Sequence, residues 1–106
     1  MARIRLAVPA QAKAGDQIEI KALIQHKMES GYRYDARGKR IERDIIVRFE
    51  CRYQGAVVFA ADFGPGIAAN PFLSFFVTAT QSGPLEFIWT DQQGETWQEH
   101  KMLNVT

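Results

Sequence analysis

The 106-residue chain has one cysteine and two histidines, so it is poor in the side chains that most often carry redox or metal chemistry. A single cysteine cannot form a disulfide within the chain, and cysteine usage therefore gives no information on the redox compartment. Zinc and iron sites need three or four converging ligands, and the spacing of His26, Glu29 and the distant Cys51 matches no recognised ligand pattern. We therefore expect no metal or other cofactor, and we expect both histidines at the surface or rim of the fold.

The sequence also lacks an excess of charge of one sign and any long apolar run. Its formal net charge is +1, and its aromatic residues lie mostly inside apolar segments, which argues against nucleic-acid binding. No apolar run approaches the ~20 residues needed to span a bilayer. Met1 leads directly into an alternating segment, with no signal-peptide pattern. From these features alone we expect a soluble protein, cytoplasmic by default.

Catalytic motifs are absent as well. The sequence has no G-x-S-x-G motif and no paired-carboxylate arrangement, and Gly64-Pro65-Gly66 lacks the Lys-Ser/Thr of a phosphate loop. Cys51 is the one candidate nucleophile, but its position in an alternating segment places it on the core-facing side. A thiol buried among apolar groups has a raised pKa and is inert. We predict no catalytic residue, and one alternative stays open, in which Cys51 meets the thiol of a partner.

Alternation of apolar and polar residues is the dominant pattern. The composition is 46% hydrophobic, which is enough for a core, and we predict one domain spanning residues 1–106. Short alternating segments separated by turns are typical of an antiparallel sandwich, and we predict an all-β, immunoglobulin-like β-sandwich of about seven strands. The expected strands are residues 4–8, 17–24, 45–53, 56–63, 72–80, 85–90 and 96–105. In residues 45–53, Ile45, Val47, Phe49, Cys51 and Tyr53 are expected on the core face and Ile46 on the opposite face. Gln54-Gly55 is typical of a tight two-residue hairpin that leads into the next strand.

The expected strand at residues 72–80 is unusual because both of its faces are apolar. Phe72 and Phe76 lie on one face, and Leu73, Phe75 and Val77 lie on the other. A sandwich strand normally has one polar, solvated face. Two explanations remain open: a bulge near Pro71 or a loop folded over the outer face, or an exposed apolar patch that a partner covers.

The connection from His26 to Asp44 is too long and too polar for an ordinary turn. Because Met28, Tyr32, Tyr34 and Ile41 give it groups to bury, we predict an ordered arm with a turn at residues 35–38. Its basic residues are interrupted by acidic ones, so the arm is either a solvated loop that pairs its own charges or the polar rim of an interface. The basic residues in question are Arg33, Arg37, Lys39, Arg40 and Arg43.

Two long loops carry a specific resemblance to a known family. The arm contains His26-Lys-Met-Glu-Ser-Gly-Tyr-Arg33, Asp35-Ala-Arg-Gly-Lys-Arg-Ile41 and Arg43-Asp-Ile-Ile46, and the second loop contains Ile67-Ala-Ala-Asn-Pro-Phe-Leu73. Together with residues 9–20 and 85–91, these segments resemble the SoxZ subunits of the bacterial thiosulfate-oxidation carrier. The likeness covers essentially the whole chain.

The resemblance implies a role that is not enzymatic. SoxZ pairs with SoxY, whose C-terminal Gly-Gly-Cys-Gly-Gly arm carries covalent sulfur intermediates between enzymes. This chain ends in Met-Leu-Asn-Val-Thr106 without a glycine-flanked cysteine, so it resembles the scaffolding partner. The family also implies a periplasmic location, reached by co-export with a signal-bearing SoxY.

We therefore predict a heterodimer with a SoxY-type subunit, which in turn meets the sulfur-oxidation enzymes. The predicted partner-binding residues share apolar character and expected exposure; they are Met28, Tyr32, Tyr34, Ile67, Phe72 and Phe76. The alternative is a free-standing β-sandwich binding module that self-associates, as a homodimer, or binds another protein.

Overall fold

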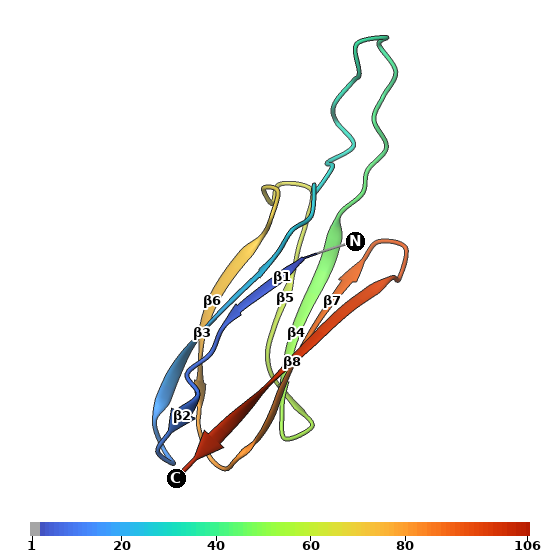
Figure 1. Cartoon of the computed structure of the whole chain (residues 1–106). Helices are drawn as coiled ribbons and strands as arrows, with labels where there is room; N and C mark the ends of the chain where they lie inside the picture. Colours follow the sequence, from blue (N-terminus) through green and yellow to red (C-terminus); the bar gives the residue numbers. More distant parts are fainter. Residues whose placement is uncertain (1–2) are drawn as a thin grey trace.

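The computed structural model describes residues 3–106, which form two packed β-sheets with a long arm projecting from one end (Figure 1). The first sheet has the strand order β1-β3-β6, and the second has the order β2-β8-β7-β4-β5. Neighbouring strands are antiparallel except that β2 runs parallel to β8. The strands are β1 (Ile4–Ala7), β2 (Gln11–Ala12), β3 (Gln17–Ile24), β4 (Ile46–Tyr53), β5 (Ala56–Asp62), β6 (Phe72–Thr78), β7 (Gly83–Asp91) and β8 (Thr96–Val105).

This architecture confirms the predicted all-β, immunoglobulin-like sandwich. The described part of the chain contains eight strands where about seven were expected. The additional strand, β2, has only two residues and pairs with the end of β8, and so short a strand leaves no alternation in the sequence. Within residues 3–106 there is no helix that is long and apolar enough to cross a membrane.

The core lies between the two sheets and is built from alternate residues of each strand. In β3 and β7 the alternation predicted from the sequence is confirmed, because every second side chain is buried. Phe49 of β4 lies at the centre, with its ring centroid 4.9 Å from that of Trp89 and 5.9 Å from that of Phe75. The largest buried side chains are Trp89, Phe49, Phe87, Ile20, Ile24, Ile45, Ile46, Leu85 and Leu103.

The start of β4 departs from the predicted alternation. Ile45 and Val47 were expected on the core face and Ile46 on the opposite face, but Ile45 and Ile46 are both buried and Val47 is half-buried. The register of β4 against β7 shifts between Ile46 and Arg48. Such a bulge inserts an extra residue into one strand and changes the face of the residues before it.

The tight hairpin predicted at Gln54-Gly55 is confirmed between β4 and β5. Both residues have positive φ, 56° and 77°, as the two central positions of a type I′ turn require. The preceding residue, Tyr53, is buried, and its hydroxyl donates a hydrogen bond to the carbonyl of Gln81 and accepts one from the Gln81 N–H at 3.0 Å. These bonds hold the β6–β7 loop against the end of β4.

Candidate partner-binding surface

The arm leaves the end of β3 and returns into β4 as an extended two-stranded projection (Figure 1). At its base Glu29 and Asp44 exchange two backbone hydrogen bonds, each 2.8 Å long. Closer to the end, the Ile41 N–H donates to the Arg33 carbonyl at 2.9 Å. The predicted turn at residues 35–38 is confirmed, because the Gly38 N–H donates to the Asp35 carbonyl at 3.0 Å. The arm is thus an ordered hairpin.

An ion pair stiffens the base of the arm. The Glu29 side chain is largely buried, and its two carboxylate oxygens accept hydrogen bonds from Arg33 Nε at 3.0 Å and Nη2 at 2.7 Å. The hydrogen bond from Arg33 lowers the pKa of Glu29, and the same bond raises the pKa of Arg33. Two parallel bonds between a guanidinium and a carboxylate fix geometry as well as charge.

Met28 was expected both as a group that the arm could bury and as an exposed partner contact, and the structure confirms only the first. Its side chain is 6% exposed, and the Ile46 N–H donates to its sulfur at 3.3 Å. The backbone of Met28 has a φ of 49°, a left-handed conformation that turns the side chain into the core as the chain enters the arm. The expected exposure of Met28 is therefore wrong, and its partner contact is withdrawn: the side chain anchors the arm to the sandwich.

His26 is likewise more enclosed than expected, whereas His100 is exposed. The His26 Nδ1 atom accepts a hydrogen bond from the Met28 N–H at 3.0 Å, and its ring meets Trp97 edge-on at a centroid distance of 5.9 Å. Its Nε2 lies 3.7 Å from an oxygen of Asp44. His26 thus has structural contacts on both ring nitrogens.

The two phenylalanines of β6 form an exposed apolar patch. Phe72 is 55% exposed and Phe76 is 62% exposed, and β6 pairs with β3 in unbroken register, with Phe72 opposite Leu23 and Phe76 opposite Glu19. Among residues 3–106 no loop covers either ring. Of the two explanations left open by the sequence, the bulge or covering loop is wrong. The exposed patch is confirmed, and its coverage by a partner stays a prediction. We call Ile67, Phe72 and Phe76 the apolar patch.

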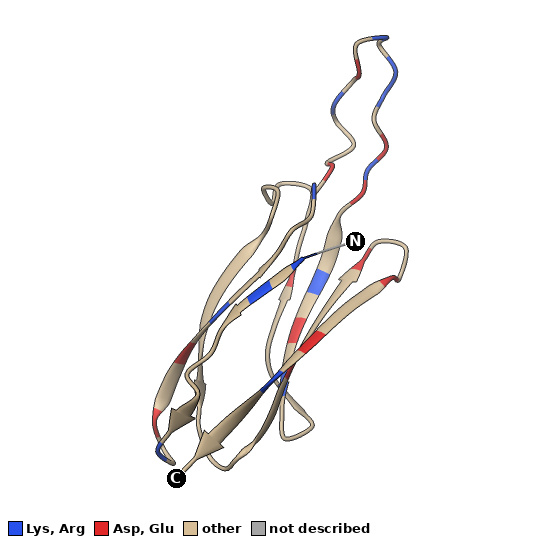
Figure 2. Cartoon of the chain, in the orientation of Figure 1, with Lys and Arg blue, Asp and Glu red and all other residues tan. Residues whose placement is uncertain are grey.

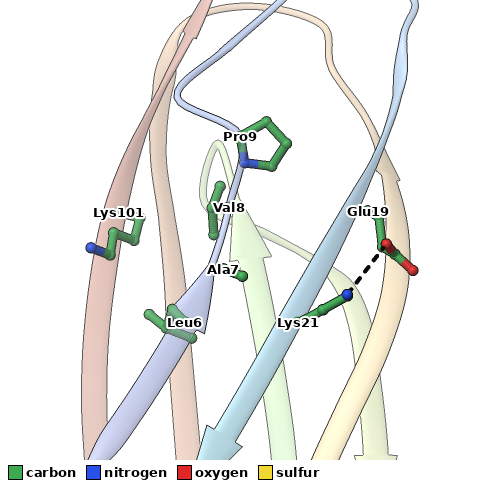
Figure 3. Close-up of a pocket in the computed structure, with 7 residues that line it drawn as sticks. All are labelled: Leu6, Ala7, Val8, Pro9, Glu19, Lys21 and Lys101. Atoms are coloured by element: carbon green, nitrogen blue, oxygen red, sulfur yellow. Dashed lines mark ion pairs between the residues drawn. The ribbon is translucent and has the colours of Figure 1, made fainter.

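Two shallow hollows border Phe72, and a third adjoins the second at the edge between β1 and β8. One hollow of about 320 Å³ lies beside the β5–β6 loop, and one of about 240 Å³ lies over β1 and β3; Phe72 lines both. Ile67, 39% exposed, lines the first of them. A third hollow of about 450 Å³ shares Leu6, Ala7 and Lys21 with the second. Figure 3 shows this third hollow, where the Lys21 amine points toward Glu19 at 4.0 Å.

Strand pairing brings further residues into this surface that the sequence interpretation missed. Arg5, Leu23 and Phe72 form one row across β1, β3 and β6, and Ala7, Lys21 and Ser74 form the next. Leu23 was visible as an apolar residue on the polar side of its strand. Its neighbours could not be inferred without the strand order.

Cys51 is completely buried, as predicted. Burial raises the pKa of its thiol to about 12, so the thiolate that would act as a nucleophile is scarcely formed near neutral pH. A partner's thiol has no access to it in this structure. Among the residues described, no group of three or more His, Cys, Asp or Glu side chains converges on a point where a metal ion could bind.

A match to a family model identifies the protein family of this chain. The family model described as sulphur oxidation protein SoxZ matches residues 4–102, a range that contains the arm, the β5–β6 loop and all the strands up to most of β8. The chain belongs to the SoxZ family. The resemblance drawn from the sequence is therefore confirmed, and SoxZ membership places the chain among sulphur oxidation proteins. No curated protein sequence matches it significantly.

Solved structures show that this SoxZ-family fold is shared with proteins of other kinds. Superoxide reductase (neelaredoxin) from Ignicoccus hospitalis is 18% identical, with a TM-score of 0.72, over 97% of this chain and 80% of that one. The sulfur carrier protein SoxY from Chlorobium limicola f thiosulfatophilum is 12% identical, with a TM-score of 0.68, over 97% of this chain and 78% of that one. A putative superoxide reductase from Thermotoga maritima is 12% identical, with a TM-score of 0.65, over 97% and 85%. At these identities the likeness is one of fold.

Proposed function

We propose that this SoxZ-family chain is a non-catalytic subunit of a sulfur carrier complex. It binds a SoxY-type partner whose terminal cysteine arm carries covalent sulfur intermediates during thiosulfate oxidation. Family membership supports the link to sulfur oxidation. The burial of the only thiol supports a scaffolding role, because a sulfur-carrying thiol needs exposure and flexible neighbours, and Cys51 has neither.

The observation that carries the proposal is the exposure of Phe72 and Phe76 on a regular, uncovered strand. Two phenylalanine rings, each more than half exposed, would gain roughly 2 kcal/mol together on being covered. Aromatic residues in the centre of a patch are the side chains that most often dominate binding energy. We therefore assign the apolar patch to the centre of the contact with the carrier subunit, with Tyr32 and Tyr34 of the arm as further contacts.

The assembly we propose is a heterodimer in the periplasm, exported together with the signal-bearing carrier subunit. In this arrangement the chain holds the carrier subunit from one side, and the carrier's own arm presents sulfur to successive enzymes. Fractionation of cells that express the chain with and without the carrier subunit tests the export step. The periplasmic fraction should contain the chain only when the carrier subunit is present.

Co-expression of this untagged chain with a tagged SoxY-type subunit, followed by size-exclusion chromatography, tests the complex itself. The wild-type chain should elute as a stoichiometric heterodimer. The double variant Phe72→Asp/Phe76→Asp should lose at least about 100-fold in affinity, because two carboxylates would have to be desolvated in an apolar contact. Circular dichroism and thermal unfolding should show that the variant stays folded, since both side chains point away from the core.

Met102 provides a matched control. It is an exposed apolar residue on β8, in the other sheet, so Met102→Asp should leave the affinity unchanged. An unchanged affinity in the double phenylalanine variant would show that the carrier subunit binds elsewhere. If the wild-type chain elutes apart from the carrier subunit, as a monomer or homodimer, the carrier-complex proposal fails and a free-standing binding module replaces it.

A further inference from the structure

The end of the arm concentrates positive charge, and three of its four cations form no ion pair within the described residues. We define the arm tip as residues 32–40, which contain four cations and one carboxylate, Asp35. The tip has a formal charge of +3 and the whole chain one of +1, which leaves −2 for the remainder. Glu29, just outside the tip, offsets Arg33, and Figure 2 shows the charged residues along the arm in blue and red. In the described part of the chain Arg33 pairs with Glu29, but Arg37, Lys39 and Arg40 form no ion pair. A self-paired loop does not account for these three cations.

Asp35, the one carboxylate in the arm tip, has a structural use. Its Oδ1 accepts hydrogen bonds from the backbone N–H groups of Arg37 and Lys39, both at 2.9 Å. A side chain that accepts bonds from its own turn stabilises that turn. The tip therefore keeps a defined shape while Arg37, Lys39 and Arg40 stay exposed.

Two tyrosines accompany the cations. Tyr32 is 75% exposed and Tyr34 is 68% exposed, so neither contributes a buried ring to folding. Arginine and tyrosine are enriched in protein interfaces, because both combine a flat apolar surface with hydrogen-bonding groups. Their combination on a turn of fixed shape is typical of a recognition surface.

The apolar patch is tied to the base of the arm, which carries the arm tip at its far end. The β5–β6 loop, which carries Ile67, is bonded to the base of the arm through Asn70 and His26, and Phe72 follows Asn70 by two residues. The base itself is held by the Glu29–Arg33 pair and by the buried Met28 side chain. A partner that covers the patch therefore meets the arm in a preset orientation, which lowers the entropy cost of binding.

We propose that the arm tip binds an acidic surface of the same carrier subunit that covers the apolar patch. This inference rests on the proposed function and adds a second, charged contact to the apolar contact proposed above. The interface has two parts with different physical properties: the patch supplies salt-independent affinity, and the arm tip supplies attraction that accelerates association and fixes orientation. The low net charge of the whole chain argues against nucleic acid as the ligand of the tip, because nucleic-acid binding depends on broad basic surfaces.

Association kinetics with the purified SoxY-type subunit, measured at low and high salt, test the inference. The variant Arg37→Glu/Arg40→Glu should associate about tenfold more slowly than wild type at low ionic strength, with little change in the dissociation rate. At high ionic strength the two association rates should converge, because salt screens charges at exposed sites. Tyr32→Ala/Tyr34→Ala should instead raise the dissociation rate at both salt concentrations.

The control variant Lys13→Glu/Arg52→Glu changes the net charge by the same amount at two cations outside the arm and the apolar patch, one in the loop before β3 and one on β4 in the other sheet. It should associate at nearly the wild-type rate. Equal slowing in both charge variants would overturn the inference, because net charge alone would then explain the effect. An arm variant that binds the carrier subunit at the wild-type rate and salt dependence would also overturn it, while leaving the carrier complex intact.

Other occupants of the arm tip give different results. The Arg37→Glu/Arg40→Glu variant could lose binding to a labelled single-stranded oligonucleotide while its binding to the carrier subunit stays unchanged. That result would show that the ligand of the arm tip is a nucleic acid and not an acidic protein surface. The variant could instead lose concentration-dependent self-association, again with unchanged binding to the carrier subunit. That result would show that the arm tip binds a second copy of the chain. Failure of the wild-type chain to bind the carrier subunit at all would count against the proposed function itself.

Discussion

Asn70 and His26 are joined by two hydrogen bonds, although they lie 44 positions apart in the sequence. The Asn70 side-chain oxygen accepts from the His26 N–H at 2.9 Å, and the Asn70 N–H donates to the His26 carbonyl at 2.8 Å. The pair connects the β5–β6 loop to the base of the arm. It therefore sets the position of the apolar patch relative to the arm, the two regions assigned to partner binding.

Asn70→Ala should loosen this junction. Asn70 has a φ of 55°, which asparagine tolerates better than alanine does, so the variant loses a hydrogen bond and gains backbone strain. We expect the free energy of unfolding to fall by about 1–2 kcal/mol, and the His26 amide to exchange faster with solvent. Denaturant unfolding and hydrogen-exchange NMR measure the two effects.

Asn70→Gly separates the two causes. Glycine adopts a positive φ without strain but has no side-chain oxygen, so fast exchange at the His26 amide should persist in this variant. A His26 amide that stays protected in both variants would show that the side chain of Asn70 does not hold the junction.

Cys51 should resist alkylation in the folded protein. With its pKa raised to about 12 by burial, about one thiol in ten thousand is ionised near pH 8, and the sulfur is also covered. Iodoacetamide should leave the native chain unmodified by mass spectrometry and modify it fully in a denaturing concentration of guanidinium chloride. Rapid modification of the native chain would indicate an accessible thiol and would reopen a covalent role for it.

Acid should release the base of the arm before it unfolds the sandwich. The hydrogen bond from Arg33 lowers the pKa of Glu29 below its ordinary value of 4.5. The stabilisation by this pair is therefore fully present above pH 4.5, and it disappears as the pH falls through the lowered pKa. NMR signals of the Glu29 and Asp44 amides, followed from neutral to acidic pH, should report the change while signals of β7 stay constant.

Glu29→Gln is the matched variant for this transition. Without the carboxylate, the base of the arm should already be loose at neutral pH and should show no acid transition of its own. If the wild-type amides of Glu29 and Asp44 report no transition before global unfolding, the ion pair does not control the order of the arm.

The family, the fold class and the inert thiol could all be predicted from local patterns. Alternation in residues 17–24 and 85–90 identified their buried faces correctly, because side chains in a strand alternate between two faces regardless of the strand's neighbours. The same phase placed Cys51 in the core. The turn residues Gln54-Gly55 marked the hairpin, because a two-residue turn is determined by the residues that form it.

The candidate surface was predicted in part. Exposure of Tyr32, Tyr34, Ile67, Phe72 and Phe76 was expected of the partner-binding residues, and the structure confirms it, whereas their contact with a partner stays a prediction. The other expectation, that Tyr32 and Tyr34 are groups that the arm buries, is wrong. Met28 has the same apolar character as these residues, and the exposure expected of it was wrong. The residues next to Met28 in the sequence do not show which of the two expectations holds, because its burial depends on where the chain turns between β3 and the arm.

The sequence by itself therefore determined the seven longer strands, most of their buried faces and the family, since these follow from residues close together in the chain. Only the tertiary structure decided that Ile46 turns inward at a bulge, that Met28 anchors the arm and that no other part of residues 3–106 covers Phe72 and Phe76. It also decided that Asn70 meets His26. Each of these depends on register and on contacts between distant segments, and such contacts form only when the two sheets pack and the loops at one end of the sandwich come together.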